Sequence, residues 1–594
     1  MVSISSRTST PIHWTCTAPI STRVVKQMET TYLTLLSTST THLPCLQSLK
    51  QLNDFYSSII LSSISNMSSS GNHEYQAFGP GKTVAVIGAG ISGVCAAAHL
   101  LKQGLRVTVF ERSGIAGGVW HYDGRISEDP PFANSMPSRG DYKLSRPGEF
   151  AYATPPPEHH ADDGEDVGHE NSSAVADLEV HFAPPGPCYA GLKNNVPTQL
   201  MTSALGSWPE GTETFVSQRY IEAYVQTLAK DHGVDEVTSF HTRVDEVRKT
   251  ADGTKWGLRL VALERGDAGP RLAERISHFD LVVVASGHYN MPRIPETEGL
   301  REWKSKFPYR IIHSKQYRSP EAYRGQNVLV IGAGVSAMDI CRELDGVAGN
   351  TYQSVRGGNF DLPASMLPKN VVRVAEVVRF GPPNASTGDG QVETEAEIPG
   401  LVVLKDGGVL KNIHHVLLAT GYVTSYPFLP ELHSDDTPIA AAGEDLLVTS
   451  DGTMAHNLHR DIFYINDPTL AFVGVPYYVA TFSLFDFQAQ ATARVFAGKA
   501  RLPGREEMRR EYEQRVEEKG LGRGFHSLHG AGLEIGYVQE LVDWVNSSGA
   551  DIGEPPMLGH SAEWKQGYDE MKAKMTALFK SGKDKEGPGT KQNI

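Results

Sequence analysis

Short apolar runs rich in β-branched residues alternate with segments of helical periodicity along most of the chain. This alternation is typical of α/β domains built on parallel sheets. The expected strands are VAVIG at 84–88, RVTVFE at 106–111, DLVVVAS at 280–286, NVLVIG at 327–332, HHVLLAT at 414–420 and LAFVGV at 470–475. Near the end, REEMRREYEQRVEEK at 505–519 predicts a solvent-exposed charged helix with a structural role.

Three segments lack this pattern. Residues 1–77 are rich in Ser and Thr and poor in acids, which favours either a disordered leader or a mitochondrial transit peptide. Residues 123–187 hold thirteen acids against four basic residues, with PPP at 155–157, and predict an irregular acidic insertion on the surface. The tail after about residue 581 is expected to be frayed.

Charge and cysteine content exclude several classes of function. The 594-residue chain has a net charge of -14, which disfavours nucleic acid as a partner. Its five cysteines are scattered without CxxC spacing, which argues against a disulfide framework, a zinc site or a disulfide reductase and fits a reducing compartment. No apolar run approaches the roughly 20 residues of a membrane helix. We expect a cytoplasmic protein, or a mitochondrial one if the leader is a transit peptide.

The strand at 84–88 runs into a glycine-rich turn and then into the helical pattern ISGVCAAAHLLKQG. Gly88, Gly90 and Gly93 form G-x-G-x-x-G, which in this context is the fingerprint of a dinucleotide site. Gly88 permits the tight turn, Gly90 lets the backbone approach a pyrophosphate, and Gly93 lets the helix pack on the strand. Ile91 and Ser92 begin the helix, whose N-terminal amides attract phosphate. We predict that these five residues bind a cofactor.

An acidic residue ends the strand that follows this turn. Glu111 lies eighteen residues after Gly93. A carboxylate at this place can accept hydrogen bonds from the hydroxyls of an adenosine ribose, and it repels a 2'-phosphate. The first site is therefore expected to take FAD or NAD rather than NADP.

A second copy of the motif begins at Gly332 and ends with alanine, in the order Gly-Ala-Gly-Val-Ser-Ala. The next strand, NTYQSVR, ends at Arg356, nineteen residues after Ala337. An arginine can pair with a 2'-phosphate, so we predict that the second site binds NADPH. The methyl group of Ala337 is expected to hold helix and strand slightly further apart than Gly93 does. The residues expected to hold this cofactor are Gly332, Gly334, Val335, Ser336, Ala337, Asp339 and Arg356.

Further motifs resemble those of the flavin-containing monooxygenases, of the kind found in fungi. The acid Glu111 is followed by SGIAGGVW, with the family's GG-x-W at its usual spacing. FPYRIIHSKQY at 307–317 is similar to the family's F-x-G-x-x-x-H-x-x-x-(Y/F), although Tyr309 replaces the glycine. VVVASGHY at 282–289 and VLLATGYVTSYPFL at 416–429 resemble the two strands that cross between domains. The resemblance covers roughly residues 80–545, apart from the insertion.

The resemblance implies that FAD occupies the first site, beside Gly117, Gly118, Val119 and Trp120. CYAGLKNNVPTQLM at 188–201 is similar to the family's L-x-(T/S)-N-x-P stretch near the flavin. It places Asn195 in register with an asparagine that helps hold the reactive oxygen adduct, and Asn194 where Thr or Ser is usual. We expect Asn195 to act in catalysis and both residues to contact a cofactor. For His313, a structural role between domains and a functional role are both open.

The resemblance also implies a reaction. NADPH reduces FAD, the reduced flavin reacts with O2 at C4a, and the hydroperoxide passes one oxygen to a nucleophilic sulfur, nitrogen or activated carbon of a small molecule. A Baeyer–Villiger monooxygenase that attacks a ketone is the alternative, although Tyr317 favours the nucleophile oxygenase. A non-catalytic nucleotide-binding redox sensor is a third hypothesis. No metal is expected, because the histidines and acids at 158–170 lie in an irregular acidic stretch. A homodimer is left open.

The predicted fold class is α/β, with two nested Rossmann-like dinucleotide-binding domains in which the NADPH domain interrupts the FAD domain. The expected divisions are a leader at 1–77, the FAD-binding domain at 78–290 and 414–545 with the acidic insertion at 123–187, the NADPH-binding domain at 291–413, and a C-terminal extension at 546–594.

Overall fold

The computed structural model describes residues 78–132, 136–144, 178–266, 269–358, 360–382, 396–530 and 532–583. The expectations for the leader, for the stretch at 158–170 and for the frayed tail lie outside the described residues and stay predictions. So do the cellular location and the homodimer. Within the described residues, no helix is long and apolar enough to cross a membrane.

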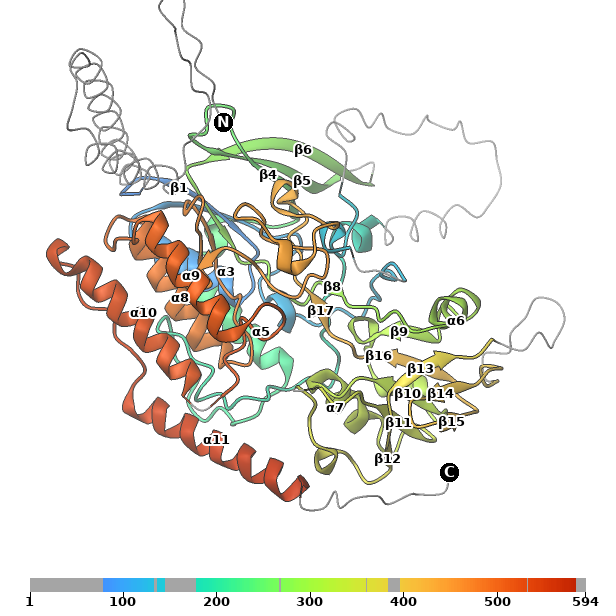
Figure 1. The fold of residues 1–594 in the computed structure, drawn as a ribbon. Coiled ribbons are helices and arrows are strands. Elements are labelled where there is room, and N and C mark those ends of the chain that lie inside the picture. The colour runs from blue at the N-terminus through green and yellow to red at the C-terminus, as the bar shows by residue number, and fades with distance from the viewer. Residues whose placement is uncertain are drawn as a thin grey trace, which may run out of the picture. The chain divides into compact units, whose positions relative to one another are not determined.

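The first sheet is built on β1 (Thr83–Ile87), which pairs in parallel with β2 (Arg106–Phe110) and β7 (Leu281–Val284) (Figure 1). The strand order is β18-β19-β20-β7-β1-β2-β3. The remaining members are β3 (Thr238–Ser239), β18 (Leu458–His459), β19 (Phe463–Tyr464) and β20 (Leu470–Phe472). The expected strands at 84–88, 106–111, 280–286 and 470–475 are thus confirmed.

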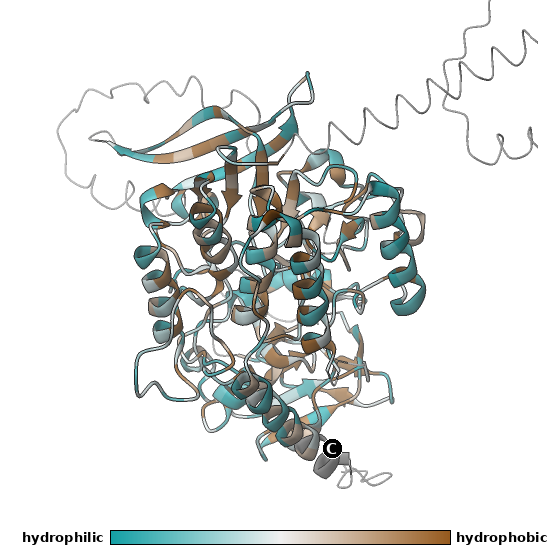
Figure 2. Ribbon diagram, turned by 90° about the vertical axis from the view of Figure 1, so that its left-hand side faces the viewer, coloured by the Kyte–Doolittle hydropathy of each residue, from teal (hydrophilic) through white to brown (hydrophobic). Residues whose placement is uncertain are grey.

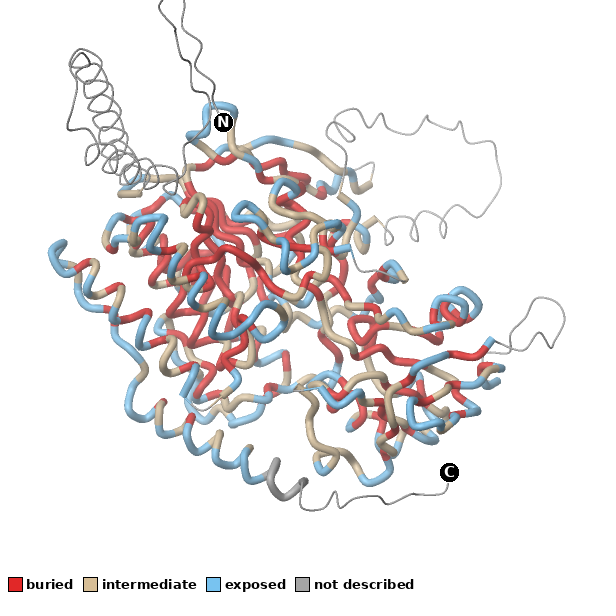
Figure 3. The backbone as a smooth tube through the Cα atoms, viewed as in Figure 1, coloured by how far each residue is buried: buried red, intermediate tan, exposed pale blue. Residues whose placement is uncertain are grey.

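Alternating residues of these strands face two different layers, as the two-residue period of a strand requires. Val84 and Val86 of β1 belong to the core that α3, α5, α8 and α10 complete, whereas Ala85 and Ile87 belong to the core shared with an antiparallel sheet on the other side. The helices are α3 (Ile91–Lys102), α5 (Gln218–Asp231), α8 (Thr481–Phe496) and α10 (Leu533–Gly549). Hydrophobic residues gather on the central strands and inward helix faces (Figure 2), and buried residues concentrate in the same places (Figure 3). Because both faces of the sheet are covered, its strands are apolar throughout.

The antiparallel sheet on that second face comprises β4 (Thr242–Lys249), β5 (Trp256–Gly266) and β6 (Gly269–Phe279). It is inserted between β3 and β7, and Trp256, Leu258 and Leu260 of β5 pack beneath the first sheet. We did not expect this sheet, because its strands carry many charged residues along the outer face and lack the continuous apolar runs of the parallel strands.

The second sheet is parallel, in the order β12-β11-β10-β16-β9. Its strands are β9 (Ile311–His313), β10 (Val328–Ile331), β11 (Thr351–Ser354), β12 (Val371–Val374) and β16 (His415–Leu418). The helix α7 (Val335–Leu344) follows β10, and a small antiparallel sheet of β13 (Val377–Phe380), β14 (Val402–Leu404) and β15 (Val409–Leu410) accompanies it. Because this sheet is complete before the chain returns to β18–β20, the nested arrangement is confirmed.

The strand β16 belongs to the second domain and not, as expected, to the first. We expected the second domain to end at residue 413, but β16 pairs with both β10 and β9 and so belongs to the second sheet. The chain crosses between the sheets through β8 (Met291–Pro292) and β17 (Tyr422–Val423), which form an antiparallel pair (Figure 1). The apolar run HHVLLAT alone did not show which of two parallel sheets it would join.

The described parts of the acidic segment are irregular as expected, apart from a short 3-10 helix at Pro137–Arg139 and a short helical stretch at 178–182. The expectation that the segment is only a solvated surface insertion is wrong for Asp141, whose side chain is buried. Its Oδ1 accepts from Arg112 Nη1 at 2.8 Å, and its Oδ2 accepts from Lys315 Nζ at 2.7 Å. Arg112 follows β2 and Lys315 follows β9, so this one carboxylate joins the two sheet domains.

The C-terminal helices also depart from the expected picture. The helix α9 (Arg505–Lys519) buries Met508 and Tyr512, and Arg515 pairs at 2.7 Å with the buried carboxylate of Asp461. It is therefore a packed helix and not merely a solvated one. The last helix, α11 (Ala562–Lys583), packs Trp564 against Leu200.

Replacing Asp141 by Asn is expected to destabilise the fold. Burial alone would raise the pKa of Asp141, but Arg112 and Lys315 outweigh it and hold that pKa well below its usual range. Removing the charge leaves the buried Lys315 and the partly buried Arg112 without a counter-ion, at a cost of about 3–5 kcal/mol in the free energy of unfolding at neutral pH. Chemical denaturation measures this loss.

Because the folded-state pKa is depressed, the stabilisation is present at neutral pH and is lost as pH falls below the ordinary value of about 3.9. The difference between Asp141→Asn and the wild type should therefore shrink in acid. Glu264→Gln is the control, since it breaks an exposed pair with Arg271 and should cost about 1 kcal/mol or less. Equal losses in the two variants would contradict the assignment.

Candidate functional site

Both glycine-rich turns open onto one cavity of about 1630 Å³. This volume exceeds the roughly 300–1,000 Å³ typical of a site for one drug-sized molecule. The residues predicted for the first site that line it are Gly88, Gly90, Ile91, Ser92, Glu111, Gly117, Gly118, Val119 and Trp120. Those of the second site are Gly332, Gly334, Val335, Ser336, Asp339 and Arg356, and Asn195 lines it as well. Three of the predicted residues do not line the cavity: Gly93, Ala337 and Asn194.

The first turn has no room for side chains at two of its glycines. Gly88 has a φ of +103°, and a Cβ there would lie 2.7 Å from the carbonyl oxygen of Ala285 at the end of β7. A Cβ on Gly93 would overlap the carbonyl oxygen of Gly88. Gly93 therefore acts in packing α3 against the turn, while the backbone of Gly88 and Gly90 forms the cavity wall.

The carboxylate of Glu111 is held in place by two backbone amides. Its Oε2 accepts from Ala89 N and its Oε1 from Ser113 N, both at 2.8 Å. These bonds tie the glycine-rich turn to the end of β2. Each carboxylate oxygen retains a second lone pair, so the group can still accept hydrogen bonds from hydroxyls in the cavity.

The GG-x-W segment closes over the same turn. A Cβ on Gly118, whose φ is +58°, would lie 2.8 Å from Gly90 Cα. The backbones at Gly90 and Gly118 therefore lie so close together that a side chain at position 118 would collide with Gly90. Trp120 lines the cavity and packs edge to face against Phe482, with ring centroids 6.4 Å apart.

The second turn has the same local geometry with one difference. Gly332 has a φ of +125°, and a Cβ there would overlap the carbonyl oxygen of Ala419, which follows β16. A Cβ on Gly334 would meet nothing within 4 Å, so this glycine faces open space. Ala337 is completely buried in the core cluster that includes β10, so the second turn has room for a methyl group at this position. The first turn has no such room at the equivalent Gly93. The alanine is thus a packing adjustment, as expected.

Three arginines lie along the wall near the second turn. Arg356 is exposed and follows the end of β11, which stops at Ser354 rather than at residue 356 as expected. Burial lowers the pKa of Arg293, and the positive charges of Arg523 and Arg356 act in the same direction. Arg293 and Arg523 were missed, because single arginines in loops 230 residues apart in sequence carry no motif. Together the three groups make this part of the cavity suitable for an anion.

The two asparagines of the 188–201 segment have different surroundings. Asn194 Nδ2 donates to Val196 O at 2.7 Å and to Thr214 O at 2.9 Å, and its Oδ1 accepts from Val216 N at 2.6 Å. Its side chain is buried, bonds to backbone groups and does not line the cavity, so the expected cofactor contact of Asn194 stays a prediction. Asn194 holds the loop that presents Asn195 to the cavity.

His313 and Tyr317 have structural surroundings. His313 is fully buried, with Nε2 bonded to Gly421 O at 3.0 Å and Nδ1 accepting from Lys315 N at 3.1 Å. Burial lowers its pKa to about 3, so the ring is neutral at physiological pH. Tyr317 is also fully buried and donates to Glu343 at 2.8 Å. The 307–317 motif therefore fixes the backbone just before β17, through the bond from His313 to Gly421. Tyr309, which stands where the family motif has glycine, is exposed to solvent.

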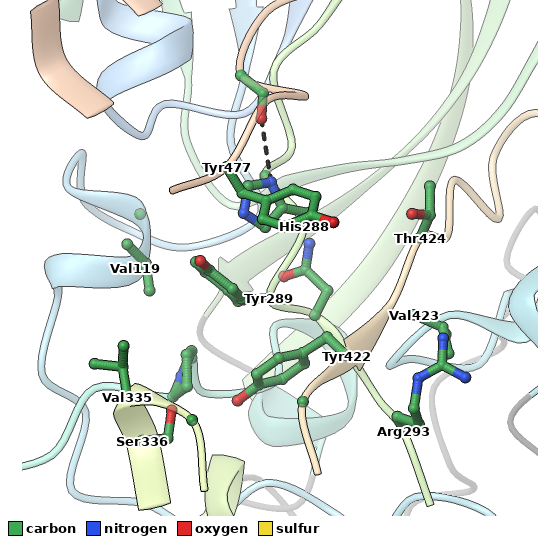
Figure 4. Close-up of a pocket in the computed structure, with 18 of the residues that line it drawn as sticks. Val119, His288, Tyr289, Arg293, Val335, Ser336, Tyr422, Val423, Thr424 and Tyr477 are labelled. Atoms are coloured by element: carbon green, nitrogen blue, oxygen red, sulfur yellow. Dashed lines mark hydrogen bonds between the residues drawn. The ribbon is translucent and has the colours of Figure 1, made fainter. Parts of the chain in front are cut away.

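Aromatic side chains line the cavity between the two turns, and sequence reasoning missed them. Figure 4 shows His288, Tyr289, Tyr422 and Tyr477 in this region. The rings of His288 and Tyr289 are 4.3 Å apart, and those of Tyr289 and Tyr422 are 5.4 Å apart. Burial lowers the pKa of His288 to about 4. The sequence does carry a signal for them: His288 and Tyr422 directly follow the glycines of the two crossing motifs, SGHY and TGYV, and Tyr289 follows His288.

Metal and disulfide chemistry find no support in the described part of the chain. No group of three or more His, Cys, Asp or Glu residues there could hold a metal ion. Cys95, Cys188 and Cys341 are buried and unpaired with one another. Burial raises the pKa of Cys188 and Cys341 to about 12, so both are thiols at neutral pH.

Comparison with known families now places the chain. The family described as flavin-binding monooxygenase-like matches residues 188–374 and 390–552, and the family described as FAD dependent oxidoreductase matches residues 83–132. The chain belongs to the flavin-containing monooxygenase family and is an FAD-dependent monooxygenase.

Several relatives are similar over most of their length. The flavin-containing monooxygenase ustF2 of Aspergillus flavus is 42% identical over 83% of this chain and 98% of its own. The flavin-containing monooxygenase iboF of Amanita muscaria is 32% identical over 80% of this chain and 90% of its own. Among solved structures, S-allyl-L-cysteine S-oxygenase from Allium sativum shares the fold, with a TM-score of 0.59, 24% identity and coverage of 85% of this chain and 95% of that one.

Gly332→Ala is expected to destabilise the second domain, because the new methyl group would need both a left-handed backbone and displacement of the Ala419 carbonyl. The two effects together should lower the free energy of unfolding by about 2–4 kcal/mol. Thermal unfolding followed by circular dichroism measures the change.

Gly334→Ala provides the matched comparison. Its backbone has a φ of -78°, and a Cβ there meets nothing. Its thermal midpoint should stay close to that of the wild type. Similar losses in both variants would show that the turn is not constrained as described.

Proposed function

We propose that this monooxygenase holds FAD at the first glycine-rich turn and NADPH at the second. With O2, it would oxygenate a nucleophilic sulfur, nitrogen or activated carbon atom of a small molecule. The observation that carries the proposal is the single cavity onto which both turns open. Two dinucleotides bound there would bring a flavin and a nicotinamide into the same water-poor space.

The first turn fits FAD. Gly88 and Gly90 present backbone without side chains, and the amides at the start of α3 are available to a pyrophosphate. Glu111 can accept from ribose hydroxyls and would repel a 2'-phosphate. The segment from Gly117 to Trp120 supplies a further wall. On this basis residues 78–290 and 419–545 would form the FAD-binding domain, with β16 left to the second domain.

The second turn fits NADPH. Gly334 leaves space for a pyrophosphate, and Val335 and Ser336 begin the helix next to it. Arg356 occupies the ribose position, where a guanidinium can pair with a 2'-phosphate. Arg293 and Arg523 add positive charge to the same wall. The NADPH-binding domain would then lie at 291–418, so that it includes β16.

Bound FAD and NADPH would supply the hydride transfer and the activation of O2. The chain itself would orient the two groups and keep water away from them. Tyr289, Tyr422 and Tyr477 make the wall between the turns largely aromatic. Asn195 presents its amide to the cavity from the loop that Asn194 holds, and we propose it as the catalytic residue.

The purified FAD-loaded protein tests this function. NADPH-dependent O2 uptake would be measured with a panel of thioethers, amines and ketones, and product masses would be checked for a gain of one oxygen atom. We expect oxygenated thioethers or amines. Oxygenation of ketones alone would replace the proposal with a Baeyer–Villiger monooxygenase, and cofactor binding without turnover would support a redox sensor.

Arg356→Ala should change the choice of nicotinamide. Losing a charged pair with a 2'-phosphate is expected to raise KM for NADPH about tenfold or more, because such pairs contribute about 1.5–3 kcal/mol. KM for NADH should change little, since NADH has no 2'-phosphate. Steady-state kinetics with both nucleotides measures the ratio.

Arg324→Ala is the control, because Arg324 is exposed in the same domain and does not line the cavity. It should affect neither nucleotide. Equal increases in KM for NADPH and NADH in the Arg356 variant would remove Arg356 from the 2'-phosphate site.

A further inference from the structure

His288 lies in the cavity wall, on the crossing segment SGHY that follows β7. Its ring is partly exposed there. The ring of Tyr289 is 4.3 Å away and that of Tyr477 is 6.4 Å away, both turned edge to face. The phosphate and ribose sites of the two glycine-rich turns leave this histidine without a role.

One ring nitrogen of His288 is bonded to the backbone. Its Nδ1 lies 3.1 Å from Gly474 O, and Figure 4 shows this bond as a dashed line. A carbonyl oxygen can only accept a hydrogen bond, so Nδ1 carries a proton. Burial lowers the pKa of His288 to about 4, so the ring is neutral at physiological pH and Nε2 keeps its lone pair. Nε2 is therefore an acceptor and not a donor.

The peptide group that fixes this tautomer is itself held in place. Gly474 N donates to Gln488 Oε1 at 2.9 Å, and Gln488 Nε2 donates to the hydroxyl of Tyr537 at 2.7 Å. That hydroxyl donates in turn to Arg460 O at 2.7 Å. Gly474 has a φ of +99°, and a Cβ there would lie 2.5 Å from Ser92 Oγ at the start of α3. Groups on α3, α8 and α10 thus fix the carbonyl that orients His288.

The other ring nitrogen, Nε2, is available to a ligand. No described residue donates a hydrogen bond to it, and the ring is partly exposed in the cavity wall. An acceptor that the fold orients and leaves without a protein partner can be satisfied by a donor on a ligand. With a pKa of about 4, His288 is too weak a base to take a proton from such a donor at neutral pH. Its chemistry suits a hydrogen bond rather than proton transfer.

The surroundings of Nε2 favour a planar ligand that carries an N–H group. Tyr289, Tyr422 and Tyr477 make this wall aromatic, and the rings of Tyr289 and Tyr422 are 5.4 Å apart (Figure 4). Aromatic walls pack well against planar rings. Phosphate oxygens only accept hydrogen bonds, so they cannot satisfy a second acceptor. Nicotinamide carries an amide N–H in its carboxamide group, and flavin carries one at N3.

We propose that Nε2 of His288 accepts a hydrogen bond from an amide N–H on the ring system of a bound cofactor. The inference rests on the proposed function and makes His288 a specificity-determining residue of the same cavity. Gln488 and Tyr537 are positioning residues, which act on His288 through the Gly474 peptide. The nicotinamide carboxamide and the flavin N3–H are the two sources of this donor, and two measurements distinguish them.

The nicotinamide source is tested with two nucleotides. Isothermal titration calorimetry of the FAD-loaded protein would compare NADP+ with acetylpyridine adenine dinucleotide phosphate, in which an acetyl group replaces the carboxamide and carries no N–H. The wild type should bind NADP+ about three- to tenfold more tightly, because the analogue loses one hydrogen bond. His288→Asn keeps a donor for Gly474 O and removes Nε2, so it should bind the two nucleotides alike.

The flavin source is tested on the same FAD-loaded proteins without any nucleotide. An alkaline titration followed in the visible spectrum reports the ionisation of the flavin N3–H. A hydrogen bond to Nε2 would stabilise the protonated group, so the flavin of His288→Asn should ionise at a lower pH than that of the wild type. A change in one measurement and not in the other identifies the donor.

Three further variants assign the effect to Nε2. His288→Gln can place an amide oxygen near the position of Nε2, and it should restore the property that His288→Asn abolishes. Tyr537→Phe releases Gln488 and should weaken the same property, and an unchanged value would remove Tyr537 and Gln488 from the positioning role. His278→Asn is the matched control, because His278 on β6 is exposed and does not line the cavity. It should behave as the wild type.

The outcomes separate this proposal from the proposed function. If His288→Asn kept both the wild-type preference for NADP+ and the wild-type titration of the flavin N3–H, the role of His288 would be overturned. Should NADPH-dependent oxygenation persist in that case, the proposed function would stand. The expected changes in a protein that yields no oxygenated product would instead retain the role of His288 and remove the proposed function.

Discussion

One buried carboxylate between two cations holds together the parts that build the site. Asp141 comes from the acidic segment, Arg112 from the end of β2 in the first sheet, and Lys315 from the turn after β9 in the second. Lys315 is buried and Arg112 is partly buried, so each needs a negative partner, and the carboxylate needs both cations to offset its own desolvation. Because no member of the cluster is satisfied alone, the two sheet domains and the acidic segment keep a defined arrangement at this junction.

The cavity follows from the way parallel strands end. In each domain the chain leaves the carboxyl end of a central strand, turns through a glycine with positive φ, and starts a helix beside that edge of the sheet. Neighbouring strands β7 and β16 limit the space, since their following carbonyls, at Ala285 and Ala419, exclude any side chain from Gly88 and Gly332. Both turns therefore present bare backbone to the same cavity, and the residues at the ends of β2 and β11 give the two halves opposite charge.

The two sheets form only part of the cavity wall. Arg523 reaches the cavity from the segment after α9, and α10 and α11 supply a wall with a carboxyl and an amino group. The helix α11 packs on the first domain through Trp564 and contacts the short helix η6 (Ala364–Met366) of the second. Because this wall is built from both domains, its shape depends on how the two domains pack together.

The sequence by itself determined the central strands, both turns, the nested order and the charge contrast between Glu111 and Arg356. These features are local: an apolar run, a glycine that must adopt positive φ and a fixed number of residues to the strand end need no knowledge of distant segments. Only the tertiary structure decided that β16 joins the second sheet, that Asn195 and not Asn194 faces the cavity, that Asp141 is buried, and that Arg293, Arg523 and Glu534 line the site. Each of those outcomes depends on contacts between residues far apart in sequence, where packing and desolvation, rather than local backbone preference, select the arrangement.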